Sequence, residues 1–261
     1  MEYLIYPVLG MFAGLIGGLL GVGGGLIVVP VLIFAFTALD FSDAVLTHMA
    51  VGTSLATIIL TSYGSVRQHH LKGAVRWDLL GWLAIGLVVG ALVGAEVAGV
   101  LKGRSLQLIF GCFALLMAAQ MGLGLKPNPK RGLPGKVGLI VSGTFIGSVS
   151  SLFGIGGGSL TVPFLTWCNV KMQEAVGTSS AGGMPIAIAG ALGFVLSGWN
   201  MPMRPEWSLG YVYLPAFIGI GITSLVFAQV GAKFAHRLPA ATLKKIFSLL
   251  LVVVGVKLIV G

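Results

Sequence analysis

Apolar segments of the length needed to cross a lipid bilayer follow one another along this chain. Of its 261 residues, 56% are hydrophobic and only 9% are charged, and the mean hydropathy is +1.01. A helix of about 20 apolar residues spans the hydrocarbon core of a membrane. The sequence therefore predicts an all-α, polytopic membrane protein that has no separate soluble domain.

Both halves of the chain carry the same glycine-rich block. The segment GLIGGLLGVGGGLIVVPVL at 14–32 returns in the same register as GSVSSLFGIGGGSLTVPFL at 147–165. A second shared block, AVGTS, follows at 50–54 and again at 175–179. Since two blocks recur in the same order, the chain contains an internal duplication.

The duplication predicts two membrane repeats, at 1–125 and 137–261, which are separated by the basic linker 126–136. In each repeat, three further apolar segments long enough to span the bilayer follow the glycine block. The predicted spanning helices cover about 43–66, 78–101, 105–124, 173–197, 208–233 and 241–260.

The glycine blocks do not fit single transmembrane helices. A continuous helix over 4–36 would be roughly 50 Å long, against a hydrocarbon core of about 30 Å. The part behind the glycines, 26–36, would reach only about 16 Å. Two half-helices folded into a hairpin fit these lengths better. Two full crossings in place of each hairpin remain the alternative, because they also bring the chain back to the side from which it entered.

The basic residues favour the hairpins. If each glycine block enters and leaves on one side, most of the 16 Lys and Arg residues lie on the face that holds the linker 126–136. If each block crosses the membrane once, the Lys and Arg residues are divided almost evenly between the two membrane faces. Cytoplasmic loops carry an excess of basic residues, so we expect the linker to be cytoplasmic. Each half then crosses an odd number of times, which makes the two repeats inverted as in secondary transporters.

The glycine blocks are also the candidate binding site. Unwound backbone at membrane depth is tolerated where it is buried in protein or lines a watery cavity. The half-helix behind each turn offers unpaired N–H groups and the positive end of its dipole, which suit an anion. Close helix packing is the alternative, and we expect it for Gly14 and other scattered glycines. The predicted anion-binding residues are Gly23, Gly24, Gly25, Gly156, Gly157, Gly158 and Ser159.

The AVGTS blocks add hydroxyl groups that could donate hydrogen bonds to an oxyanion. In membrane helices such hydroxyls also bond their own backbone or a neighbouring helix, which is the alternative interpretation. The predicted donors are Thr53, Ser54, Thr178 and Ser179. His48, one turn before Gly52, could contact the anion or relay a proton, or could be a hydrogen-bonded structural histidine.

Other functional classes lack the residues they need. Cys112 and Cys168 lie far apart and match no metal spacing, so we expect neither a metal site nor a cofactor. No nucleophile, base and orienting group converge in the sequence, which argues against a membrane-embedded enzyme. The net charge of +9 comes from short loops and reflects membrane topology rather than nucleic-acid binding.

The glycine motifs and the prolines behind them, Pro30 and Pro163, resemble those of the TauE/SafE family of membrane exporters over nearly the full chain. The resemblance implies a secondary transporter of the cytoplasmic membrane that exports sulfite, sulfoacetate or a related organosulfonate. We expect alternating access, with H⁺ or Na⁺ as the candidate coupling ion. A carrier of another small anion or solute and an anion channel are the alternatives.

The charge distribution predicts which loops face the cell exterior. In a background without Cys112 and Cys168, cysteines replacing Lys130 and Ala240 should be shielded from an impermeant thiol reagent added to intact cells. A cysteine replacing Asn200 should react. If Ala240→Cys reacts while Asn200→Cys does not, the two glycine blocks enter from the same side and the repeats are not inverted.

Overall fold

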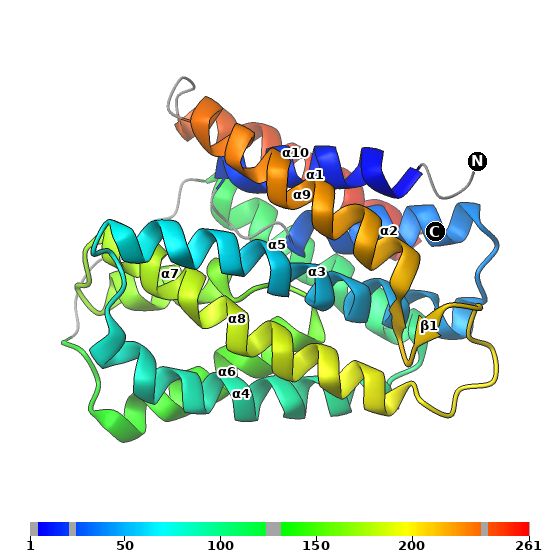
Figure 1. Ribbon diagram of the computed structural model, residues 1–261, viewed down its shortest axis with the longest axis horizontal. Coiled ribbons are helices and arrows are strands. Elements are labelled where there is room, and N and C mark those ends of the chain that lie inside the picture. The colour runs from blue at the N-terminus through cyan, green and yellow to red at the C-terminus, as the bar shows by residue number, and fades with distance from the viewer. Residues whose placement is uncertain (1–4, 21–24, 124–131, 236–239, 261) are drawn as a thin grey trace.

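The computed structural model describes residues 5–20, 25–123, 132–235 and 240–260. Within them the chain forms ten helices and one small antiparallel β-hairpin (Figure 1). The elements are α1 (Ile5–Leu20), α2 (Gly25–Ala38), α3 (Asp43–Leu71), α4 (Trp77–Val100), α5 (Gly103–Gly122), α6 (Lys136–Leu152), α7 (Gly158–Trp167), α8 (Met172–Ser197), β1 (Ser208–Leu209), β2 (Val212–Tyr213), α9 (Leu214–Ala235) and α10 (Ala240–Val260).

Helices occur in all of the predicted spanning ranges. Among the described residues, α3, α4, α5 and α8 are long and apolar enough to cross a membrane. The prediction of a helix from residue 208 is wrong at its start, because α9 begins only at Leu214. Positive φ angles of 64° at Trp207 and 58° at Gly210 turn the chain into the β-hairpin that precedes α9.

In each half of the chain, the two helices of the glycine block fold back on each other. Leu139 near the start of α6 packs in one apolar cluster with Leu165 near the end of α7. In the first half, Tyr6 of α1 and Phe36 of α2 both contact the ring of Tyr213, at centroid distances of 5.9 and 5.7 Å. The outer ends of each helix pair therefore lie together. With ten residues, α7 is only about 15 Å long.

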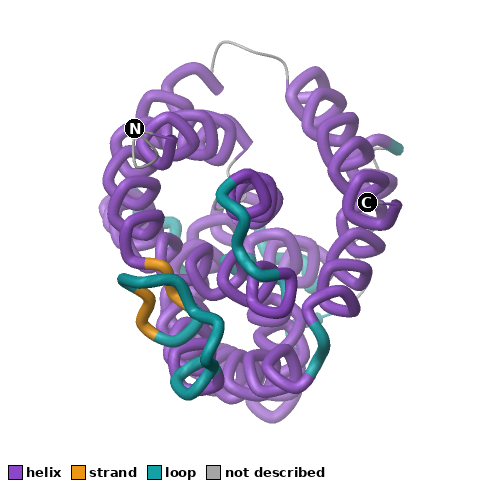
Figure 2. The backbone as a smooth tube through the Cα atoms, turned by 90° about the vertical axis from the view of Figure 1, so that its right-hand side faces the viewer, coloured by secondary structure: helices purple, strands orange, loops and turns teal. Residues whose placement is uncertain are grey.

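The two longest helices, α3 and α8, run antiparallel beside each other through the molecule (Figure 1). Along this contact Gly52 lies against Phe194, Leu55 against Gly190, and Ser62 against Gly183. Three further helix pairs join the two halves: α4 packs along α6, α1 along α9, and α5 along α10. The short helices α2 and α7 pack on α3 and α8 of their own halves. Figure 2, which looks along most of these helices, shows the pairs surrounding the middle of the bundle.

Glycines bring the backbones of α4 and α6 into direct contact. A Cβ atom added at Gly86, Gly90 or Gly94 would run into the backbone of α6, and one at Gly143 would lie 2.5 Å from the carbonyl oxygen of Leu83. The same packing joins α1 to α9, where a Cβ at Gly14 would lie 2.6 Å from Ser224. The prediction that Gly14 serves close helix packing is confirmed.

This contact predicts a difference between two glycines of α4. Gly90→Ala should lower the unfolding temperature and the yield of inserted protein, because its methyl group would overlap the carbonyl of Thr144. Gly81→Ala is the matched control, since a Cβ at Gly81 meets no atom within 4 Å and alanine favours a helix. Equal unfolding temperatures for the two variants in detergent would contradict the importance of this contact.

Candidate functional site

The ends of the two glycine blocks meet between α3 and α8. A Cβ atom at Gly25, the first residue of α2, would lie 2.6 Å from the carbonyl oxygen of Gly154 and 2.9 Å from the Cα atom of Ile155. From α8, a Cβ at Gly183 would lie 2.7 Å from the carbonyl oxygen of Gly156. We call this place, formed by Gly25, residues 153–158 and the flanking parts of α3 and α8, the hairpin junction. Gly23 and Gly24 fall outside the described residues.

The turn of the second block is held by its own backbone. Gly154 and Gly157 have φ angles of +64° and +74°, a conformation that glycine adopts without strain. The N–H group of Ile155 donates to the carbonyl of Ser150 at 2.9 Å, and that of Thr161 donates to the carbonyl of Gly157 at 2.7 Å. Helix α7 starts directly behind this turn, so the N–H groups of Gly158 and Ser159 have no acceptor within the helix.

Two buried hydroxyl groups flank Gly157. A Cβ atom on Gly157 would lie 3.5 Å from Oγ1 of Thr161 and 3.8 Å from Oγ of Ser150. Ser150 is 0% and Thr161 1% exposed. In the part of the chain that the structure describes, neither hydroxyl has a hydrogen-bond partner, and the same holds for the hydroxyls of Ser151 and Ser159. Polar groups converge here on a helix start.

The sequence analysis missed Ser150, Ser151 and Thr161. The sequence does contain a signal for them, which is a difference between the two aligned blocks. At these three positions the second block has serine or threonine, whereas the first block has glycine or valine. Hydroxyl residues in apolar helices are usually discounted, since most bond their own backbone. Thr166 in α7 does so, donating to the carbonyl of Val162 at 2.9 Å.

Thr53 and Thr178 hold loops in place. The backbone N–H of Tyr213 donates to Oγ1 of Thr53 at 3.0 Å, and that of Arg76 donates to Oγ1 of Thr178 at 2.9 Å. The glycine before each threonine lets the same loop approach. A Cβ at Gly52 would lie 2.9 Å from the carbonyl oxygen of Tyr211, and one at Gly177 would overlap that of Ala74. We call these two equivalent contacts the Thr53 latch and the Thr178 latch.

The serines of the AVGTS blocks lie beside these threonines. Ser54 donates a hydrogen bond of 2.8 Å to the carbonyl oxygen of Gly154, which ties α3 to the hairpin junction. Ser179 is buried in α8, and its hydroxyl has no partner among the described residues. The position equivalent to Gly154 in the first block, Gly21, falls outside those residues.

His48 contacts the end of another helix. Its Nε2 atom lies 2.9 Å from the carbonyl oxygen of Ala98 and 3.0 Å from that of Leu101, and its ring stacks on Tyr211 at 4.9 Å. Carbonyl groups at a helix C-terminus lack intrahelical donors, and an imidazole N–H satisfies them. Within the described residues His48 thus joins α3, α4 and the loop before α9, while its buried Nδ1 atom has no hydrogen-bond partner there.

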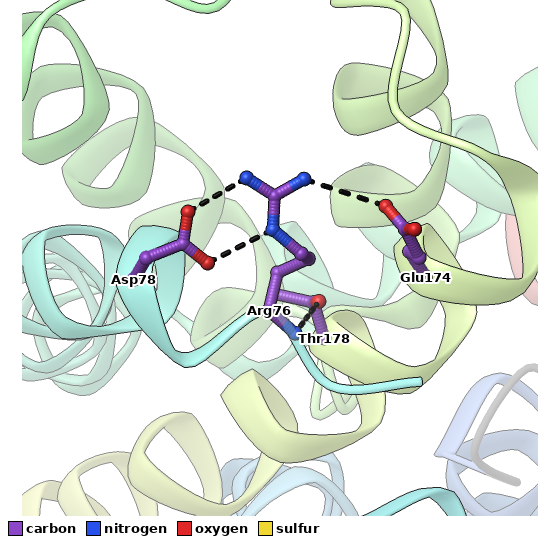
Figure 3. A network of polar contacts seen from close by, with 4 residues as sticks. All are labelled: Arg76, Asp78, Glu174 and Thr178. Carbon is purple, nitrogen blue, oxygen red and sulfur yellow. Dashed lines mark hydrogen bonds and ion pairs between the residues drawn. The ribbon is translucent and has the colours of Figure 1, made fainter. Parts of the chain in front are cut away.

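An ion-pair network lies over the Thr178 latch (Figure 3). The guanidinium of Arg76 donates to both carboxylate oxygens of Asp78, at 2.9 and 2.6 Å, and to Oε2 of Glu174 at 3.4 Å. The hydrogen bond to Asp78 is the main reason that the pKa of Arg76 is raised, so this side chain stays charged. Arg76 thus connects the first half of the chain to the first turn of α8.

Groups that bind metals do not gather in the described residues. Those ranges hold no set of three or more His, Cys, Asp or Glu side chains that could coordinate an ion. Cys112 is exposed on α5 and Cys168 is buried behind α7, and neither forms a disulfide. At the hairpin junction, the described residues offer the hydroxyl groups of Ser150, Ser159 and Thr161 and the N–H groups at the start of α7.

The known proteins that this chain resembles are all described as membrane transporters or exporters. The family model described as Sulfite exporter TauE/SafE matches residues 6–258. A probable membrane transporter protein of Haemophilus influenzae is 38% identical over 258 residues, covering 98% of this chain and 97% of the relative. The probable membrane transporter protein YunE of Bacillus subtilis is 28% identical, with 99% and 98% coverage. No solved structure matches the chain. Since the family model and the relatives span nearly its whole length, this chain belongs to the TauE/SafE sulfite exporter family of membrane transporters.

Proposed function

We propose that the chain exports a small sulfur-containing oxyanion, such as sulfite or sulfoacetate, across the cytoplasmic membrane by alternating access. Membership of the family supports the class of substrate. The observation that carries the proposal is the hairpin junction, where two glycine blocks meet beside the start of α7 and beside buried hydroxyl groups. Helix starts and hydroxyls of this kind bind oxyanions in many proteins.

Binding would use neutral donors. The N–H groups of Gly158 and Ser159 lie at the positive end of the α7 dipole. The ends of the Ile58 and Ile186 side chains lie beside Gly156 and Gly157, so a ligand would have to displace them to reach these N–H groups. In the first block, Gly23, Gly24 and Gly25 would offer the start of α2 in the same way. Thr53, Ser54 and Thr178 support this site, because they fasten the helices and loops that enclose it, and the buried hydroxyl of Ser179 is a further candidate donor.

The pairing of helices supports two repeats of inverted topology, at 1–125 and 137–261. The central helices α3 and α8 run antiparallel, and the contact of α4 with α6 has its counterpart in that of α9 with α1. Inverted repeats bind their substrate near the bilayer midplane and open to either side in turn. The re-entrant course of both glycine blocks would put the hairpin junction at that depth.

The two latches are the proposed gates. The Thr178 latch lies at the start of α4. The Thr53 latch lies near Tyr211, whose ring stacks on His48, and His48 contacts the end of α4. A helix of 24 residues is about 36 Å long, so the latches close opposite ends of the molecule. Release of one latch at a time, driven by H⁺ or Na⁺, would give alternating access.

The proposed site predicts a specific loss of transport. Gly157→Leu should abolish efflux of sulfite from proteoliposomes, because a Cβ atom there would lie 2.6 Å from Cδ1 of Ile186 and the φ angle of +74° disfavours side chains. Gly135→Leu, where a Cβ meets no atom within 4 Å, is the control. Equal efflux by both variants would contradict the site, and failure of the unaltered protein to move sulfite, sulfoacetate or thiosulfate would contradict the proposed function.

The proposed gate predicts a change in exposure. In a protein without its native cysteines, thiol labelling of Val75→Cys should become about two- to fivefold faster when Glu174→Gln is added, because exposed ion pairs contribute about 0.2 to 1 kcal/mol. High salt should have the same effect. Glu206→Gln, in an exposed loop before β1, should leave the labelling rate unchanged. Equal rates in all three proteins would argue that the Thr178 latch does not depend on the Arg76 network.

A further inference from the structure

We infer that the second hairpin makes the hydrogen bonds that select the oxyanion, through the hydroxyl groups of Ser150 and Thr161 beside the start of α7. This inference rests on the proposed function and makes its site more specific. It differs from a symmetric clamp between two helix starts, because it assigns the hydrogen bonds that select the ligand to one half of the chain. The ligand class is a compact anion with several acceptor oxygens on one centre, as in sulfite or a sulfonate.

The first support is the state of the two hydroxyls. Both are fully or almost fully buried, at 0% and 1% exposure, and neither has a partner within the described part of the chain. Buried polar side chains in native proteins are nearly always hydrogen-bonded, since an unpaired one is costly. An ideal Cβ atom on Gly157 would lie 3.5 and 3.8 Å from the two hydroxyl oxygens and 2.6 Å from Cδ1 of Ile186, so an anion between the hydroxyls would displace the end of that flexible side chain. Donors that lack partners and converge on a helix start are suited to a ligand.

The second support is the difference between the halves. In the aligned glycine blocks, Ser150 and Thr161 stand where the first block has Gly17 and Val28. The glycines of the turn are shared by both blocks, whereas these hydroxyls are not. Shared residues serve the shared backbone geometry, and the residues that differ give the second hairpin donors that the first does not have.

The chemistry of the donors fits a transported anion. Hydroxyl and amide groups are neutral, so they can bind a charged oxygen without forming an ion pair that each transport cycle would have to break. Each oxygen of a sulfite or sulfonate group can accept from a different donor. The N–H groups of Gly158 and Ser159 and the hydroxyls of Ser150 and Thr161 approach from the turn and from α6 and α7, so several oxygens can be contacted together.

Thermal unfolding of the purified full chain, with and without sulfite or sulfoacetate, tests this inference. Ser150→Ala and Thr161→Val should each weaken binding of both anions about tenfold or more, because hydrogen bonds to charged groups are among the stronger ones. Without anion, both variants should unfold at or above the temperature of the unaltered protein, since each removes a buried hydroxyl that has no partner. A purely structural role for these hydroxyls would lower that temperature instead.

Thr166→Val is the matched control, because the same substitution in the same helix removes a hydroxyl that already donates to the carbonyl of Val162. It should bind both anions like the unaltered protein. If Ser150→Ala and Thr161→Val also bind like the unaltered protein, the inference is wrong while the proposed function stands. If the unaltered protein binds neither sulfite nor sulfoacetate, the proposed function itself is wrong.

Discussion

A helix can be interrupted inside a membrane only where protein supplies partners for the backbone groups that the break sets free. The turn between α6 and α7 meets this condition. Ser54 of α3 donates to the carbonyl of Gly154, and the N–H of Ile155 returns to the carbonyl of Ser150. Gly183 of α8 lets that helix approach the turn closely. The central position of α3 and α8 follows from this requirement, because these helices cover the interrupted backbone.

The two AVGTS blocks make equivalent contacts in the two halves of the chain. Each AVGTS block uses its glycine to admit a loop and its threonine to accept an N–H group from it. In both cases the loop belongs to the other half of the chain. A residue of one repeat therefore completes the structure of the other.

The sequence predicted the membrane helices, the break at the second glycine block and the packing role of Gly14, because hydropathy, glycine content and repetition are local patterns. It did not predict the β-hairpin before α9, which depends on positive φ angles at Trp207 and Gly210. Nor could it assign Thr53 and Thr178, whose partners lie 160 and 102 residues away along the chain. Ser150 and Thr161 were missed for a related reason, since only the fold shows which hydroxyls lack a partner.

The glycine contacts between α4 and α6 have a mechanical consequence. Helices whose backbones touch over several turns cannot tilt against each other without opening a gap, so they move together. One of these helices comes from each half of the chain, and the same is true of α1 and α9. Each of these rigid helix pairs thus contains one helix from each sequence repeat. Any large motion carries pieces of both halves at once, and the boundary between moving parts does not coincide with the linker.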